Sequence, residues 1–157
     1  MIRTVHGSIK EVAAFRLGPG MDVMNGIKEV CEQKGIKNGV VLSAIGSLDG
    51  AAVCNPMPVT TAKFGFGYGK PTEFVGQIEL ISANGTICHG DNGEVLLHLH
   101  CSLSDRNGNA YGGHMVEGMN KVLMTTDVII GVLDKIDMIR RYDEETGVPM
   151  FHPEALA

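Results

Sequence analysis

Several features that mark common protein classes are missing from this sequence of 157 residues. No stretch approaches the roughly 18 continuous apolar residues of a transmembrane helix. The first residues, Met-Ile-Arg-Thr-Val-His, are too polar for a secretory signal peptide. The four cysteines form no C-x-x-C pair. We therefore expect a cytoplasmic protein with no membrane partner, whose thiols are reduced and mostly buried.

Clustered positive charge is also missing. The chain has 13 Lys and Arg against 18 Asp and Glu, and its formal net charge is −5. A domain that binds DNA through its phosphates normally carries a basic patch or stripe. The only adjacent basic pair here is Arg140-Arg141, which we interpret as the solvated end of a strand. The charge balance opposes direct DNA binding.

Glycine, in contrast, is abundant: 21 of the 157 residues, nearly twice the usual share of about 7%. Many of these glycines stand in Asn-Gly, Asp-Gly and Gly-Gly pairs, which favour tight turns between antiparallel strands. Asp49-Gly50 and Asn84-Gly85 are predicted to be hairpin turns. Residues 55–72, which hold three prolines and a run of alternating aromatic and glycine residues, are predicted to be a loop or an irregular edge.

The apolar pattern predicts one helix among many strands. Residues 23, 24, 27, 30 and 31 form a helical stripe, and Gly35 is a suitable stop. Strands are predicted at 8–17, 39–46, 51–54, 74–82, 86–89, 94–103, 110–116, 122–134 and 136–142. The predicted fold class is α+β, a mostly antiparallel β-sheet with one long helix packed on it. We expect one domain over residues 1–148, and a peripheral tail over 149–157.

Three histidines stand out within this pattern: His98, His100 and His114. One residue, Leu99, separates the first two, so a strand would place both imidazoles on one face. A hairpin centred on Asn107 would set residue 114 directly opposite residue 100, with Cβ atoms about 4.5–5.5 Å apart. Three converging imidazoles suit a divalent transition metal such as zinc and leave a coordination position open.

Other interpretations of the histidines stay open. Each ring could be satisfied by a backbone carbonyl, and the group could act as a pH sensor because imidazoles titrate near neutrality. His89, on the preceding predicted hairpin, is a weaker fourth ligand candidate. Glu79 and Glu117 are carboxylates that could orient the imidazoles. Arg16 and Lys70 could contact a small anionic ligand, although solvent exposure is the simpler interpretation of each.

The chain resembles the PPC domain family, the plant and prokaryote conserved domain. The matching features run in order from Phe15-Arg16-Leu17 through Val41 to Ser47, Ile78 to Ile87 and His98-Leu-His100 to Gly112-Gly113-His114. The resemblance implies an antiparallel sheet, a homotrimer, and the three-histidine pattern of single-domain bacterial and archaeal members. Plant members bind DNA through an attached basic AT-hook, and no Arg-Gly-Arg arm is found in this sequence.

These observations lead to three hypotheses of function. The first is a metal-binding homotrimer with a regulatory or small-ligand-binding role. The second is a zinc-dependent hydrolase or lyase, in which the metal activates a water, with Glu79 as general base and Arg16 or Lys70 on an anionic substrate. The third, suggested by the family, is a DNA-associated transcription regulator. The residues alone leave the choice between enzyme and binding protein open.

Overall fold

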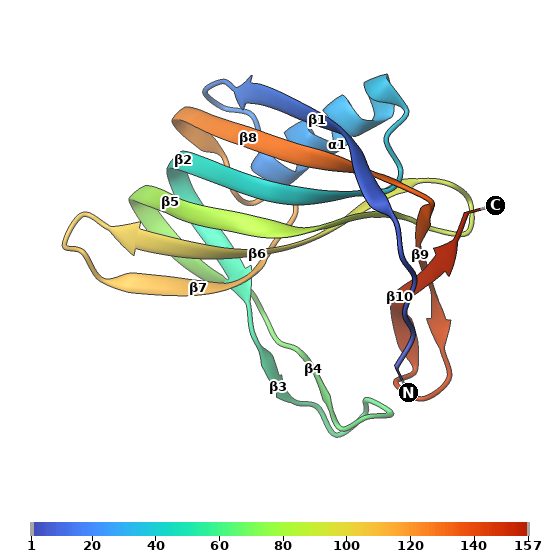
Figure 1. Cartoon of the computed structure of the whole chain (residues 1–157). Helices are drawn as coiled ribbons and strands as arrows, with labels where there is room; N and C mark the ends of the chain where they lie inside the picture. The colour runs from blue at the N-terminus through green and yellow to red at the C-terminus, as the bar shows by residue number, and fades with distance from the viewer. Residues whose placement is uncertain (1, 157) are drawn as a thin grey trace.

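A long, curved β-sheet forms most of the molecule (Figure 1). This computed structural model describes residues 2–156. The strands are β1 (Ser8–Leu17), β2 (Gly39–Cys54), β3 (Pro56–Pro58), β4 (Phe66–Tyr68), β5 (Thr72–His89), β6 (Val95–Asp105), β7 (Ala110–Met115), β8 (Val122–Asp134), β9 (Ile136–Asp143) and β10 (Val148–Ala155), with helix α1 (Val23–Lys34) between β1 and β2. Eight strands join in the order β1-β8-β2-β7-β6-β5-β9-β10, and β2 also pairs with β5.

Helix α1 forms where the stripe and the stop signal predicted it. The Asp22 side chain caps its first turn by accepting a hydrogen bond from the Asn25 backbone N–H at 3.0 Å. Gly35 ends it in the left-handed conformation, with φ of 68°. The helix buries Val23, Ile27 and Cys31 in the same core cluster as the inward-facing residues of the sheet. We call the opposite face of the sheet, turned away from α1, the outer face.

The fold is mostly β, not the expected α+β arrangement with a long helix. Within residues 2–156 the one helix has 12 residues, whereas β2 and β5 have 16 and 18. These two strands are long because both predicted hairpin turns are wrong. At Asp49-Gly50, β2 continues through an irregularity in its pairing with β5. At Asn84-Gly85, β5 continues straight through, paired with β6.

Gly85 is in the strand because a larger residue does not fit there. A Cβ atom at this position would lie 1.9 Å from the backbone oxygen of His98 on β6. The glycine therefore marks a close approach of two backbones. A glycine inside a strand often occurs for this reason, as an alternative to a turn or a bulge. This approach sets β6 against β5 at the position from which His98 projects.

Two further segments contain more structure than the sequence suggested. Strands β3 and β4, within the predicted loop 55–72, form a separate two-stranded ribbon that projects from the body (Figure 1). Residues 148–155 form β10, which pairs with β9 along its whole length at the edge of the sheet. All four cysteines are free thiols, and three of them are buried. No helix among the described residues is long and apolar enough to span a bilayer.

Candidate metal centre

Strand β6 presents two of the three histidines on the outer face. Its side chains alternate strictly: Leu97 and Leu99 point into the core, while His98 and His100 are exposed. This alternation is the period of two that any half-buried strand imposes. The prediction that both imidazoles share one face is confirmed.

The third histidine, His114, lies on β7, which forms the predicted hairpin with β6. Strands β6 and β7 pair with His100 directly opposite His114 and Ser104 opposite Ala110, so the hairpin is centred on Asn107. Asp105 holds the turn, because its Oδ1 accepts hydrogen bonds from the backbone N–H groups of Asn107 and Asn109 at 2.8 and 3.0 Å. Gly112, two residues before His114, lies where β7 comes close to β6. A Cβ atom on Gly112 would lie 2.6 Å from the Cys101 backbone oxygen.

The three rings converge. Their centroids are separated by 4.9 Å for His98 and His114, 5.0 Å for His98 and His100, and 5.5 Å for His100 and His114. Each ring offers one nitrogen such that all three nitrogens lie within 4.8 Å of one another. Within the described residues, no other group of three His, Cys, Asp or Glu side chains meets this condition.

The donor set fits a tetrahedral transition metal. Metal–nitrogen bonds of about 2.0–2.1 Å at tetrahedral angles separate two ligand nitrogens by roughly 3.3 Å. The Nε2 atoms of His98 and His100 are 3.2 Å apart. The Nδ1 atom of His114 is buried and has no hydrogen-bond partner. A site with three imidazoles from one chain has a fourth position for a water or a ligand.

Burial and nearby charges lower the pKa of two of these imidazoles, those of His98 and His114. Burial, followed by the charges of His98, His100 and Arg140, lowers the pKa of His114 to about 4. Burial, followed by His100 and Arg140, also lowers the pKa of His98. Neutral imidazole is the ligating species, so His98 and His114 need not lose a proton at neutral pH before a metal binds.

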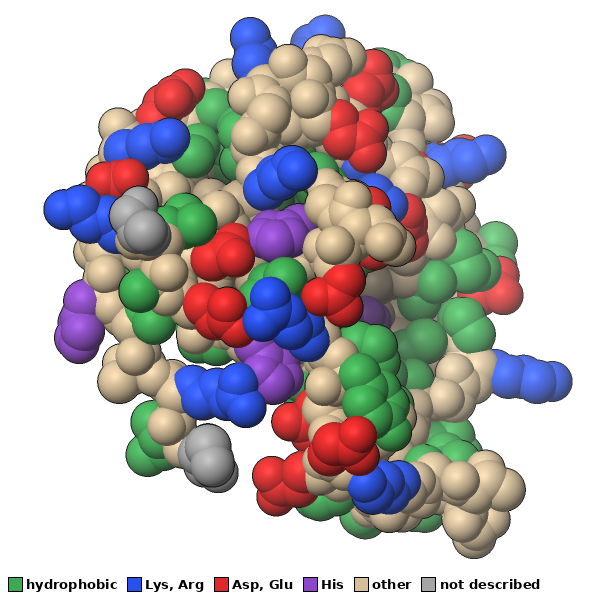
Figure 2. All heavy atoms as spheres, turned by 90° about the vertical axis from the view of Figure 1, so that its right-hand side faces the viewer, with side chains coloured by type: hydrophobic (Ala, Val, Ile, Leu, Met, Phe, Trp, Pro, Cys, Tyr) green, Lys and Arg blue, Asp and Glu red, His purple; other side chains and the backbone are tan. Residues whose placement is uncertain are grey.

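Two residues beside the cluster were not predicted from the sequence. The Tyr68 ring, on the projecting ribbon, lies 4.9 Å from the His114 ring at an interplanar angle of 33°. Arg140, on β9, is the cation whose charge acts on both His98 and His114. Figure 2 faces the β9–β10 end of the molecule, where histidine and charged side chains of both signs gather. Neither residue had a signal in the sequence, because both approach the cluster through tertiary structure.

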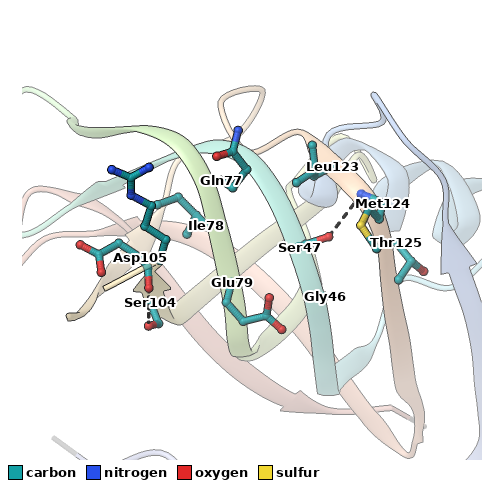
Figure 3. A pocket seen from close by; sticks show the side chains of 11 residues that line it. Gly46, Ser47, Gln77, Ile78, Glu79, Ser104, Asp105, Leu123, Met124 and Thr125 are labelled. Atoms are coloured by element: carbon teal, nitrogen blue, oxygen red, sulfur yellow. Dashed lines mark hydrogen bonds between the residues drawn. The ribbon is translucent and has the colours of Figure 1, made fainter. Parts of the chain in front are cut away.

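The other candidate residues lie apart from the three histidines. Glu79 pairs with Ser104, four residues beyond His100 on β6, which is roughly 13 Å along a strand. It lines a shallow outer-face groove of about 510 Å³ together with Ser47, Asp105 and Met124 (Figure 3). Arg16 pairs with Asp127, where β1 meets β8.

Three further candidates have other surroundings. Lys70 is exposed between β4 and β5. Glu117 forms an ion pair with Lys28 at 2.8 Å. Both nitrogens of His89 are engaged: Nε2 contacts Asp137 at 2.6 Å, and Nδ1 contacts the Gly90 carbonyl oxygen at 3.0 Å. His89 is therefore outside the ligand cluster, and its hydrogen bond with Asp137 links β5 to β9.

The fold and the site together define a class: a mostly β protein with one short helix and a three-histidine cluster on the outer face of its sheet. The chain belongs to the Plants and Prokaryotes Conserved (PCC) domain family, whose model matches residues 5–134. The family resemblance noted from the sequence is thereby confirmed.

Solved structures agree with this assignment. A metal-containing protein from Archaeoglobus fulgidus matches with a TM-score of 0.81 and 24% identity, over 96% of this chain and 99% of that one. A plant- and prokaryote-conserved protein from Pyrococcus horikoshii also gives a TM-score of 0.81 with 24% identity, over 99% and 100% of the two chains. At this level of identity the two likenesses establish the fold.

A curated relative is longer. The bifunctional protein GlmU of a Synechococcus strain is 26% identical over 151 residues, which is 96% of this chain. The chain spans only 21% of that relative's length. The match therefore concerns one segment of the longer protein.

Proposed function

We propose that this protein is a metal-binding member of its family, in which His98, His100 and His114 hold one divalent transition metal, with zinc as the first choice. The observation that carries the proposal is the convergence of three imidazole nitrogens within 4.8 Å on the outer face. The metal-containing relative from Archaeoglobus fulgidus supports it. When bound, such an ion supplies a Lewis acid and lowers the pKa of its water toward about 7.

The role that fits best is the binding of a small ligand at the open metal position, in a regulatory or sensing protein. The catalytic alternative, a hydrolase or lyase, requires a general base beside the metal-bound water. The carboxylate considered for that task, Glu79, lies near Ser104 and not near the histidines. Ligand binding therefore needs fewer additional groups than catalysis does.

Metal analysis of protein purified without chelators tests this proposal. We expect about one transition-metal ion per chain, and loss of that metal in the double variant His100→Ala, His114→Ala. The matched control is His89→Ala, which removes an imidazole outside the cluster and should retain the metal. Wild-type protein that stays metal-free after incubation with Zn²⁺, with unchanged thermal stability, would contradict the proposal.

We also propose that the protein assembles as a homotrimer through the outer face. That face exposes an apolar patch on β1, β2, β5 and β8, whose members are 41–68% exposed: Val12, Leu42, Ile45, Ile81, Met124 and Ile129. Monomeric proteins rarely leave a large contiguous patch of this kind uncovered. The histidines share the outer face, so a neighbouring copy seated on the patch would lie on the same side of the sheet as the metal centre.

Light scattering tests the assembly. We expect three times the mass of one chain for the wild type and the mass of one chain for the double variant Ile45→Glu, Met124→Glu, because two buried charges would oppose association. Val148→Glu, an exposed apolar residue on β10, is the control and should remain trimeric. A monomeric wild type at micromolar concentration would refute the assembly.

A further inference from the structure

His152 is a buried polar residue on β10, at one edge of the sheet. Only 8% of its surface is exposed. Its Nδ1 atom lies 2.5 Å from a guanidinium nitrogen, Nη1, of Arg3. Its Nε2 atom is buried and has no hydrogen-bond partner. Buried polar atoms without a partner are rare in folded proteins, so this one calls for an explanation.

The contact with Arg3 fixes the protonation state of this imidazole. A guanidinium has N–H donors and no acceptor, so Nδ1 of His152 must be the acceptor in the contact. An imidazole that accepts at Nδ1 is neutral and carries its one proton on Nε2. The nearest carboxylate oxygen to Nε2 that forms an ion pair with it, Oδ2 of Asp143, is 3.9 Å away. That distance is too long for a hydrogen bond, so the neutral ring is hydrogen-bonded to Arg3 alone.

The same contact ties the N-terminal segment to β10. Residues 2–7 precede β1 and belong to no helix or strand, and Figure 1 shows their trace beside β10. Among the hydrogen bonds of the described residues, the one between Arg3 and His152 is the only one that involves this segment. Both partners lie outside residues 5–134, the part of the chain that the family model matches.

Asp143, the last residue of β9, offers His152 a second partner. Its Oδ1 accepts hydrogen bonds from the backbone N–H and the hydroxyl of Thr146 at 2.9 and 3.0 Å. These bonds hold the half-buried carboxylate in place. Oδ2 is the oxygen that faces Nε2 of His152. A positive charge on the imidazole would therefore find a fixed counter-charge on its Nε2 side.

The remaining charged groups around the ring are also carboxylates. Glu145, in the turn between β9 and β10, lines the same hollow of about 320 Å³ as Arg3 and His152. Glu154, on the same strand as His152, is paired with Arg141 at 2.5 Å. Arg3 is therefore the one cation that contacts the ring among the described residues.

We propose that Arg3, His152 and Asp143 form a pH-sensitive clasp, which holds the N-terminal segment on β10 while His152 is neutral and releases it when the imidazole gains a proton. A proton on Nδ1 removes the acceptor of the Arg3 hydrogen bond and places two cations in contact. The same proton makes the ring a cation, which the Asp143 carboxylate attracts. The clasp depends neither on the metal centre nor on the assembly.

NMR relaxation of the backbone amides of residues 4–6 tests the clasp across the range of about pH 5 to 8, in which imidazoles ordinarily change their charge. For wild type we expect order parameters near about 0.85 at the upper end and below about 0.6 at the lower end. His152→Asn keeps a side-chain oxygen in the place of Nδ1 and gains no proton, so its segment should stay ordered throughout. Arg3→Met should be mobile throughout. His6→Gln, which removes the imidazole of the segment itself, is the matched control and should respond to pH as wild type does.

Four results would overturn the proposal. The first is a wild-type segment that is equally ordered at the two ends of the pH range. The second is a pH response that persists in His152→Asn, and the third is a pH response that is lost in His6→Gln. The fourth concerns the amides of β1 in the same spectra, which should stay near about 0.85 throughout. If β1 loosened together with the segment, general unfolding would explain the release and the clasp would not.

Discussion

Asn120 fastens the segment that follows His114 to the core, and its replacement should destabilise the protein strongly. Its side chain is fully buried. Oδ1 accepts a hydrogen bond from the Ala52 backbone N–H at 3.0 Å, while Nδ2 donates to the carbonyl oxygens of Ala52 at 3.3 Å and Val116 at 2.6 Å. These bonds tie the end of β7 to β2.

The expected cost of Asn120→Ala follows from what each partner would retain. The Ala52 carbonyl would still accept from the Val116 N–H, and the Val116 carbonyl from the Met119 N–H. The Ala52 N–H would lose the Asn120 acceptor, at a cost of about 1–3 kcal/mol, and each of the two lost carbonyl bonds adds about 0.5–1.5 kcal/mol. The total centres on about 4 kcal/mol, which corresponds to a fall in Tm of roughly 8–16 °C for a chain of this size.

Thermal and urea unfolding measure this effect. The protein concentration is kept the same in all samples, because association between chains would otherwise shift the apparent stability. Asn92→Ala is the matched control, since Asn92 is exposed in the turn between β5 and β6; its effect should stay within about 0.5 kcal/mol. A loss below about 1 kcal/mol in Asn120→Ala would show that these hydrogen bonds do not hold β7 in place.

Three further predictions concern the sheet, the His89 pair and nucleic acid. Gly85→Ala should lower the free energy of unfolding by more than about 2 kcal/mol, because its Cβ would collide with the His98 carbonyl. The control Gly18→Ala, with open space around the site, should be neutral. Equal urea midpoints for Gly85→Ala and wild type would refute the close approach. Burial acts to lower the pKa of His89, but hydrogen bonds to Asp137 and Gly90 hold it above its ordinary value, so the pair should stabilise the fold below about pH 6.5 and lose this contribution as pH rises through the folded pKa. NMR titration of Asp137→Asn should show a lower His89 pKa, and a wild-type advantage that grew with pH would contradict this. In a gel-shift assay, duplex DNA should remain unbound even at low salt, given the net charge of −5; a salt-dependent shift would refute the charge argument.

The histidine cluster could be predicted from the sequence because its determinants are local. Strand alternation fixes His98 and His100 on one face, and a short turn fixes the pairing of His100 with His114. The lengths of β2 and β5 could not be predicted in the same way. An Asn-Gly or Asp-Gly pair favours a hairpin only when the glycine is not required for another reason. At position 85 glycine is required because the backbone of β6 comes too close for a side chain.

The surroundings of the cluster were beyond local reasoning. Arg140 follows His98 by more than forty residues, and its strand, β9, meets β5 at a single parallel pairing. From the sequence, the Arg140-Arg141 pair is predicted to be the solvated end of a strand. That holds for Arg141, which is exposed and paired with carboxylates, whereas Arg140 is half-buried and its charge acts on His98 and His114. Only the three-dimensional arrangement separates the two neighbours.

Anomalous X-ray scattering from crystals grown without chelator tests the central claim most directly. At the zinc absorption edge we expect one peak per chain, about 2.0–2.1 Å from a nitrogen of each of His98, His100 and His114. If Zn²⁺-soaked crystals showed no peak there and the imidazoles were joined only by hydrogen bonds, the three histidines would not form a metal centre.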